Sequence, residues 1–256
     1  MDEVFDQKSD PVLAYRNNEF LDSDDGRQLR ILAEYLEPLD RFRRERVHDT
    51  VVFFGSARLK EKGPMGNYYA DARELSRRLT EWSKKLPGDS RFVVCSGGGG
   101  GIMEAANRGA SDAGGRSIGL NIGLPHEQRP NAYATPSLLF EFHYFFMRKL
   151  WFSHLARALV VFPGGFGTLD ELMETLTLSQ THKLNRETLV ILYGSAYWKE
   201  ILNFDALVRY EMIDSQDLQL FHYADDPETA FRILEAGLPI SLETKSPAIA
   251  KSKTVK

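Results

Sequence analysis

The sequence lacks three features that would assign it to a broad class at once. Among its 256 residues there is one cysteine, Cys95, and no hydrophobic run approaches the roughly 18 residues that a membrane-spanning helix needs. A single cysteine cannot form an internal disulfide, and the first 25 residues are acidic, whereas a signal peptide begins with a basic segment. We therefore expect a cytoplasmic protein that does not bind membranes.

A surplus of charge of one sign is also missing, since 32 Lys and Arg residues face 36 Asp and Glu residues. Most of the net charge of −4 comes from the two ends, because residues 1–25 hold eight acids and two bases and residues 245–256 hold four lysines and no acid. The segment between them is nearly neutral. This distribution predicts no nucleic-acid partner, and any bound anion must be recognised locally.

Metal-binding patterns are absent as well. The six histidines occur without an HExxH motif or any paired spacing typical of a metal site, so we predict no metal and no cofactor. They are His48, His126, His143, His154, His182 and His222. Cys95 ends an apolar run, which is more typical of a packed core residue than of a reactive thiol.

What the sequence does contain is enough apolar material, 43% of residues, for one sizeable core. Short β-rich apolar runs alternate with segments of helical periodicity, which predicts an α/β protein with a Rossmann-like, doubly wound parallel sheet flanked by helices. We expect one domain over 26–240, preceded by a flexible or helical acidic extension (1–25) and followed by a disordered basic tail (241–256). The expected strands are 50–54, 91–95, 116–120, 158–162, 188–193 and 219–223. One helix is expected to begin at 26, and the others are expected at 64–86, 102–113, 143–156, 168–182, 195–210 and 227–236. The stretch 121–137 is expected to be irregular.

The first candidate binding loop is the glycine run 97–101, which lies between an expected strand and an expected helix. Glycines let the backbone approach a ligand closely, and the amides at the start of a helix attract anions. The run lacks the Lys-Ser/Thr of a P-loop, and five adjacent glycines match dinucleotide-binding patterns trivially. A tight turn without a ligand is the alternative.

The second candidate loop, 163–171, also ends a strand and begins a helix. Gly165, Gly167 and Thr168 would place backbone donors at the positive end of the helix. Thr168 and Glu171 have the spacing of a capping box, with Thr168 as the N-cap. Alternatively, Glu171 is a general base or stabilises a developing positive charge beside the anion site.

A third signal is the pair Arg148-Lys149 inside an otherwise apolar and aromatic segment, 144–152. Two adjacent cations in a mostly covered helix need a partner. A snorkelling Lys149 and a structural ion pair for Arg148 would satisfy them, but a phosphate or a catalytic carboxylate would do so better.

Together these segments resemble the Lonely Guy family of cytokinin riboside 5′-monophosphate phosphoribohydrolases. The resemblance covers about 50–210, through Gly55-Ser56, the loop and helix 97–110, Arg148-Lys149 and, most specifically, the PGGxGTxxE motif at 163–171. The N-terminal extension and the longer 121–137 region are similar to the long bacterial branch. Gly100 departs from the branch, where many members have proline.

The resemblance implies that Arg148 and Glu171 are the catalytic residues. It implies substrate contacts at Gly55, Ser56, Gly98, Gly99, Gly100, Glu127, Lys149, Gly164, Gly165, Phe166, Gly167, Thr168, Asp170 and Thr177. In the compact plant enzymes a substrate-binding glutamate precedes the Arg-Lys pair, and no glutamate has that spacing here. Glu127 is the substitute that we expect for it.

The function implied is hydrolysis of the N-glycosidic bond of a purine nucleoside 5′-monophosphate, with free base and ribose 5-phosphate as products. A nucleotide-binding or phosphometabolite-binding protein without catalysis is the main alternative, and a pyridoxal-phosphate decarboxylase is the weakest. The aromatic helix expected at 143–156 carries more apolar surface than one sheet face requires. We therefore expect a homodimer, or a higher homo-oligomer, with that helix near the interface.

Overall fold

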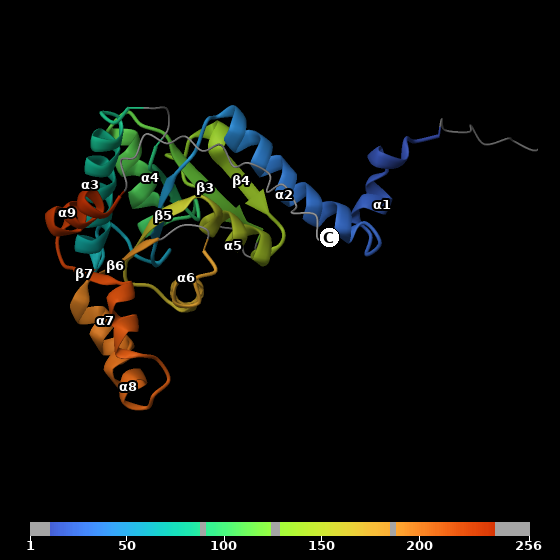
Figure 1. Cartoon of the computed structure of the whole chain (residues 1–256). Helices are drawn as coiled ribbons and strands as arrows, with labels where there is room; N and C mark the ends of the chain where they lie inside the picture. The colour runs from blue at the N-terminus through green and yellow to red at the C-terminus, as the bar shows by residue number, and fades with distance from the viewer. Residues whose placement is uncertain (1–10, 88–90, 124–128, 185–187, 239–256) are drawn as a thin grey trace, which may run out of the picture.

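The computed structural model describes residues 11–87, 91–123, 129–184 and 188–238, and in them seven parallel strands form one sheet (Figure 1). Their order across the sheet is β4-β3-β2-β1-β5-β6-β7. Helices cover both faces, so the predicted α/β fold class is confirmed. The strands are β1 Thr50–Phe54, β2 Val93–Ser96, β3 Ser117–Ile122, β4 Leu139–Phe142, β5 Ala156–Val161, β6 Leu189–Tyr193 and β7 His222–Ala224.

Alternation along the central strands creates two apolar layers. In β1, Val52 and Phe54 belong to one buried cluster, whereas Val51 and Phe53 belong to the other, because successive side chains point to opposite faces. The first layer is covered by α2 (Arg27–Arg44), α5 (Phe145–His154), α6 (Phe166–Gln180) and α7 (Ser195–Ile201). The second is covered by α3 (Gly66–Ser83), α4 (Ile102–Asp112) and α9 (Pro227–Gly237).

The sheet order reverses at β1, which pairs with β2 on one side and with β5 on the other. Loops that follow two such strands run to opposite faces and leave a crevice beyond their carboxyl ends, where ligands bind in doubly wound sheets. The loops that begin at Gly55 and Pro163 follow these two strands, and the glycine run 97–101 follows the neighbouring β2. The topology therefore gathers the predicted loops at one edge.

Two elements differ from the sequence prediction. Strand β4 was not expected, because its four residues come just after the 3-10 helix Pro136–Leu138 and offer too short a pattern. Pairing with β3 at the sheet edge forms it. The single helix expected at 195–210 is two, α7 and α8 (Phe204–Arg209). Asn203 begins α8, where its side chain accepts a hydrogen bond from the Ala206 amide. Short 3-10 helices complete the chain at Ala14–Arg16, Pro136–Leu138 and Ser215–Leu220.

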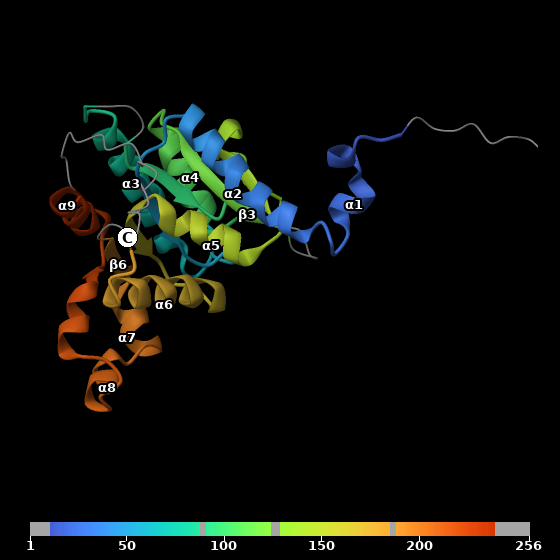
Figure 2. The ribbon, with the colours of Figure 1, turned by 45° about the vertical axis from the view of Figure 1, so that its right-hand side comes forward.

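The N-terminal extension contains the short helix α1 (Asn18–Asp22), which lies beyond the N-terminal end of α2 and away from the sheet (Figures 1 and 2). The predicted basic tail, 241–256, and residues 1–10 lie outside the described residues. Within the described ranges no helix is both long and apolar enough to cross a membrane.

Candidate active site

Backbone hydrogen bonds join the loops at the switch point. The amide of Ser56, after β1, donates to the carbonyl of Pro163, after β5, over 2.9 Å. The carbonyl of Ser56 in turn accepts from the amide of Ile102, the first residue of α4, over 3.2 Å. Gly55 allows this close approach, because a Cβ there would lie 2.7 Å from Cγ1 of Ile102. Ser56 therefore holds the start of the 163–171 loop and the start of α4 in a fixed relation.

Two positions of the glycine run 97–101 require glycine because of their backbone conformation. Gly98 and Gly101 have φ angles of +72° and +64°, in the left-handed region that favours glycine. The amide of Gly98 donates to Ser96 Oγ over 3.0 Å, so it is engaged within the protein. Among the described residues, no acceptor faces the amides of Gly99 and Gly100. Of the predicted loop contacts, these two are the amides available to an anion.

Asn131, which the sequence prediction missed, anchors this run. Its Nδ2 donates to the carbonyls of Gly98 and Gly99, both over 3.0 Å, and to Oδ1 of the fully buried Asn107 over 2.9 Å. The same Asn107 oxygen accepts from Ser96 Oγ over 2.7 Å. An asparagine after Pro130 in an irregular stretch has the pattern of an ordinary turn residue, so no local signal identified it.

Helix α6 begins earlier than predicted. Its N-cap is Gly165, without a side-chain cap, and Thr168 lies inside the first turn against Gly164. The capping-box interpretation of Thr168 and Glu171 is therefore wrong, because the extended backbone at Gly165 lets the helix start at Phe166. Within the described chain, no acceptor faces the amides of the first turn, which remain free for an anion.

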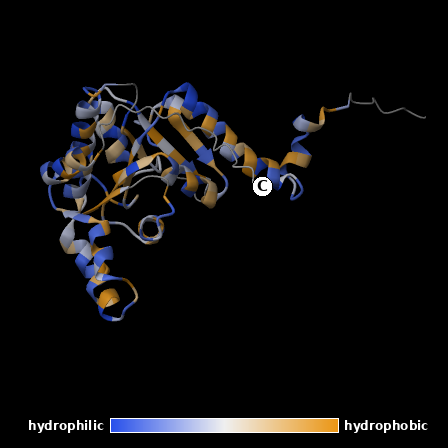
Figure 3. Cartoon of the chain, viewed as in Figure 1, coloured by the Kyte–Doolittle hydropathy of each residue, from blue (hydrophilic) through white to orange (hydrophobic). Residues whose placement is uncertain are grey.

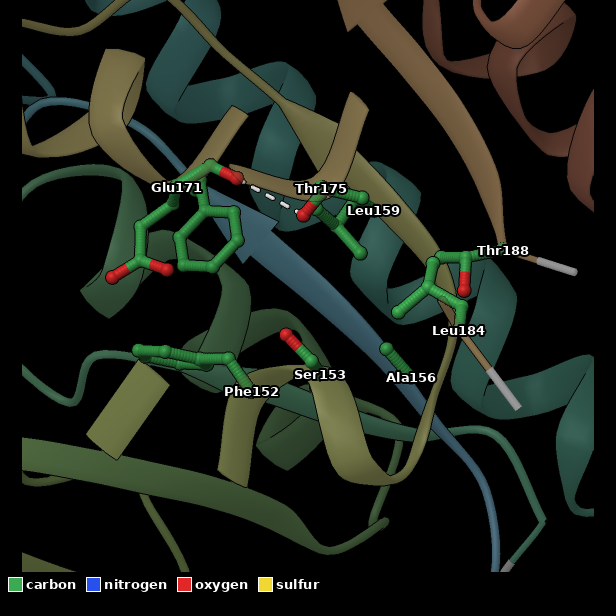
Figure 4. A pocket seen from close by; sticks show the side chains of 9 residues that line it. Phe152, Ser153, Ala156, Leu159, Glu171, Thr175, Leu184 and Thr188 are labelled. Carbon is green, nitrogen blue, oxygen red and sulfur yellow. Dashed lines mark hydrogen bonds between the residues drawn. The ribbon is translucent and has the colours of Figure 1, made fainter. Parts of the chain in front are cut away.

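Glu171 is buried, with 6% of its surface exposed, at the second turn of α6. Its carboxyl group points toward Phe152 of α5 (Figure 4), and it lies at one end of a small, narrow pocket whose other walls are mostly apolar. Burial raises the pKa of Glu171 to about 7, against the opposing effect of the positive charges of Arg148 and Lys149. A carboxylate in this setting changes protonation near neutral pH.

Arg148 comes from α5, which lies beside α6 in Figure 2. Its Nη2 is 3.9 Å from Glu171 Oε1, and its guanidinium lies between the rings of Phe145 and Phe152 at 5.1 and 5.6 Å. Burial lowers the pKa of Arg148, while the carboxylates of Glu171 and Asp170 oppose that change. Its buried Nε has no acceptor within the described residues. Arg148 thus has an unused donor beside the carboxylate that it pairs with.

Lys149 faces two carboxylates of α6, Asp170 Oδ2 at 3.0 Å and Glu174 Oε2 at 2.8 Å. Burial disfavours its charge, but the hydrogen bonds that the Lys149 ammonium donates to these carboxylates outweigh burial and raise its pKa. Lys149 therefore forms ion pairs and does not snorkel freely.

The remaining predicted residues lie less centrally. The Phe166 side chain is 92% exposed at the start of α6. Thr177 donates its hydroxyl to the carbonyl of Met173 within α6, about 9 Å along the helix from Glu171 at 1.5 Å per residue. Glu127 lies outside the described residues.

A sheet of this topology, with free amides at two loop–helix junctions beyond its switch point, is typical of the Rossmann-like α/β proteins that bind phosphorylated ligands. The family model described as "Possible lysine decarboxylase" matches residues 103–234, just over half of the chain. The chain therefore belongs to this family, the Lonely Guy family that its motifs resemble.

Named relatives support the assignment. A rice (Oryza sativa subsp. japonica) protein named probable cytokinin riboside 5′-monophosphate phosphoribohydrolase LOG4 is 27% identical over 183 residues, 70% of this chain and 73% of its own. The Arabidopsis thaliana protein named cytokinin riboside 5′-monophosphate phosphoribohydrolase LOG2 is 25% identical over 206 residues, which are 79% of this chain and 87% of its own. The solved structure of TM1055 shares the fold, with a TM-score of 0.53 and 24% identity over 73% of this chain and 99% of its own.

Proposed function

We propose that this protein hydrolyses the N-glycosidic bond of a purine nucleoside 5′-monophosphate to free base and ribose 5-phosphate. The observation that carries the proposal is the buried Glu171, whose pKa is about 7, paired with Arg148 one turn beyond a helix N-terminus with free amides. Relatives named as phosphoribohydrolases for cytokinin riboside 5′-monophosphates support the same reaction.

We assign the phosphate group of the substrate to the loops 97–101 and 163–171. Amides of Gly99 and Gly100 and of the first turn of α6 can donate to phosphate oxygens, and the dipole of α6 adds positive potential there. Asp170 and Lys149 neutralise each other at this end. A dianion can therefore bind without a net positive surface.

The reaction replaces the bond between C1′ of the ribose and the base nitrogen with a bond from C1′ to water oxygen. The departing base nitrogen takes up one proton and the attacking water gives one up, so the atoms balance. Positive charge develops on the ribose ring as the bond lengthens, and the ionised carboxylate of Glu171 stabilises that charge or orients the water. The positive charge of Arg148 favours the ionised form of Glu171, and the unused Nε of Arg148 donates to the substrate.

The pH dependence follows from the raised pKa of Glu171. Below about pH 7 the carboxyl is protonated and can neither stabilise a cation nor accept a proton from water, so the active fraction falls as the pH falls. We expect kcat/KM for AMP to fall about tenfold per pH unit below this pKa and to level off above it. Initial rates of adenine release across the acid and neutral range test this; a constant kcat/KM down to pH 5 would contradict the role of Glu171.

Two glycine-to-alanine variants, at Gly167 and at Gly164, distinguish an effect on anion binding from an effect on folding. A Cβ at Gly167 meets nothing within 4 Å, so Gly167→Ala should keep the fold and raise stability by up to about 1 kcal/mol, as expected for alanine in a helix. Its methyl group would occupy space beside the amides of the first turn, and we expect KM for AMP to rise about tenfold or more, a loss of about 1.4 kcal/mol in binding.

Gly164→Ala is the matched comparison, because a Cβ there collides with Thr168. It should lower the unfolding temperature as well as the activity. Thermal unfolding and KM measured on both variants give the result; an unchanged KM in a folded Gly167→Ala protein argues against an anion site at this helix.

The choice of base is tested with a panel of nucleoside 5′-monophosphates, in which the free base is measured by chromatography. AMP and isopentenyladenosine monophosphate are the informative pair. Release of base from either, and not from the matching nucleoside without phosphate, supports the proposal.

Two other functions make different demands on the site. A binding protein without catalysis needs the glycine loops but not Glu171, so tight AMP binding without base release would favour it. A pyridoxal-phosphate decarboxylase needs a lysine that readily loses its proton, whereas two carboxylates hold Lys149 charged.

We also propose that the protein is a cytoplasmic homodimer. Phe145, Phe146 and Leu150 of α5 are exposed beside the site, and a second copy would cover them. Monomers in light scattering at micromolar concentration would contradict this.

A further inference from the structure

The turn between β5 and α6 contains a peptide group that is held from one side. The carbonyl of Gly164 accepts a hydrogen bond from the hydroxyl of Tyr197 over 2.7 Å. A trans peptide group is planar, so its N–H points opposite to its C=O. The amide of Gly165, which belongs to the same peptide group, therefore points away from Tyr197. No hydrogen bond among the described residues uses this amide, which adds to the free amides at the start of α6.

Tyr197 reaches the turn from α7, which follows β6, the neighbour of β5 in the sheet. The adjacent Trp198 anchors this part of α7. Hydrophobic residues dominate the strands of the sheet (Figure 3), and Trp198 is fully buried against them. Its indole nitrogen donates to the carbonyls of Val161 and Tyr193, at the ends of β5 and β6, both over 3.0 Å. The Tyr197 hydroxyl thus has a fixed position relative to the end of β5.

The peptide group between Gly164 and Gly165 has freedom to rotate, because neither residue has a side chain. Rotation by about 180° would change φ of Gly165 from −92° to about +88°, with ψ at −152°. Glycine adopts this combination, whereas residues with a Cβ strongly avoid it. The rotated peptide group would turn its negative carbonyl, in place of its N–H, toward an anion at the start of α6. Among the described residues, the Tyr197 hydroxyl is the donor that opposes this rotation.

We propose that Tyr197 is a positioning residue of the anion site, whose hydroxyl keeps the peptide group 164–165 in the orientation that presents the Gly165 amide to the substrate phosphate. The inference rests on the phosphate assignment in the proposed function. Tyr197 acts through the peptide group and needs no contact with the substrate. Its loss should therefore weaken substrate binding and leave the chemistry at Glu171 unchanged.

Tyr197→Phe tests this role, because it removes one hydroxyl and keeps the ring that packs edge-on against Trp198. A neutral hydrogen bond changes an equilibrium constant by up to about tenfold. We expect Kd and KM for AMP to rise by about three- to tenfold and kcat to stay within about twofold, since only molecules with the correct peptide orientation bind. Tyr210→Phe is the matched control, because Tyr210 is 68% exposed at the end of α8, and it should change neither constant. An unchanged Kd, or a fall in kcat alone, in the Tyr197→Phe protein would overturn the proposal.

Gly165→Ala distinguishes peptide orientation from a general loss of structure. A Cβ at Gly165 meets nothing within 4 Å, and alanine adopts φ near −92°, so the substitution keeps the observed orientation and excludes the rotated one. Tyr197→Phe introduced together with Gly165→Ala should change Kd by less than about twofold relative to Gly165→Ala alone. An equal effect of Tyr197→Phe with and without Gly165→Ala would show that Tyr197 does not act through this peptide group.

Crystal structures without ligand give a result that does not depend on the reaction. A threefold rise in Kd requires that about one third of the molecules keep the competent orientation, so the rotated peptide group should predominate in Tyr197→Phe and be absent with Gly165→Ala. If the unsubstituted chain bound AMP and released no adenine, the proposed hydrolysis would fail, but the comparison of Kd values would still decide the role of Tyr197. A Tyr197→Phe structure in which the peptide group is entirely unrotated would contradict that role.

Discussion

Replacing Glu171 with glutamine is expected to lower kcat for base release from AMP by about 10²–10⁴-fold, the usual cost of removing one positioned general acid–base or electrostatic group. Glutamine keeps the shape of the side chain but has no negative charge to offer a developing ribosyl cation. The binding loops are unchanged by the substitution, so KM should change much less than kcat. Steady-state kinetics with chromatographic detection of adenine measure both.

The control for this variant is Glu235→Gln, which removes an exposed carboxylate from α9 on the opposite face of the sheet. It should keep the activity of the natural chain. A Glu171→Gln protein that releases adenine at the natural rate would show that the carboxylate is not used, and a rise in KM alone would place Glu171 in binding.

Replacing Arg148 with methionine is the second large effect we expect, a fall in kcat/KM of about 10²–10³-fold at pH 7. Methionine fills a similar space between Phe145 and Phe152, so the loss comes from the charge and the donors. Two causes contribute: the unused Nε no longer contacts substrate, and Glu171 loses the positive charge that opposes its burial.

The loss of the positive charge beside Glu171 can be measured separately, in the pH dependence of kcat/KM. Without Arg148 the pKa of Glu171 rises further above 7, so the acid limb of the kcat/KM profile should move to higher pH. Arg148→Lys keeps the positive charge, so the acid limb of its kcat/KM profile should lie nearer to that of the unsubstituted chain. A Met variant whose limb coincides with that of the natural chain would show that Arg148 does not act on Glu171.

The alternation of apolar runs and helical patterns was sufficient to predict most of the fold, because a buried parallel strand and an amphipathic helix each leave a local trace. Strand β4 left none, since four residues after Pro136 resemble an irregular segment until β3 pairs with them. The start of α6 was misplaced for a related reason. Thr168 has the residue type of an N-cap, but the extended backbone at Gly165 allows the helix to begin earlier.

The sequence by itself determined which residues could carry the chemistry, because glycine loops between strands and helices, and charges within apolar segments, are unusual wherever they occur. Only the tertiary structure decided how they act together. Residues 148 and 171 are far apart along the chain, and packing of α5 against α6 brings the Arg148 guanidinium to 3.9 Å from the Glu171 carboxylate. The apolar walls that raise the pKa of Glu171 and the Asn131 anchor of the glycine run likewise come from distant segments. Burial and hydrogen bonding depend on neighbours in space, which a local sequence pattern does not contain.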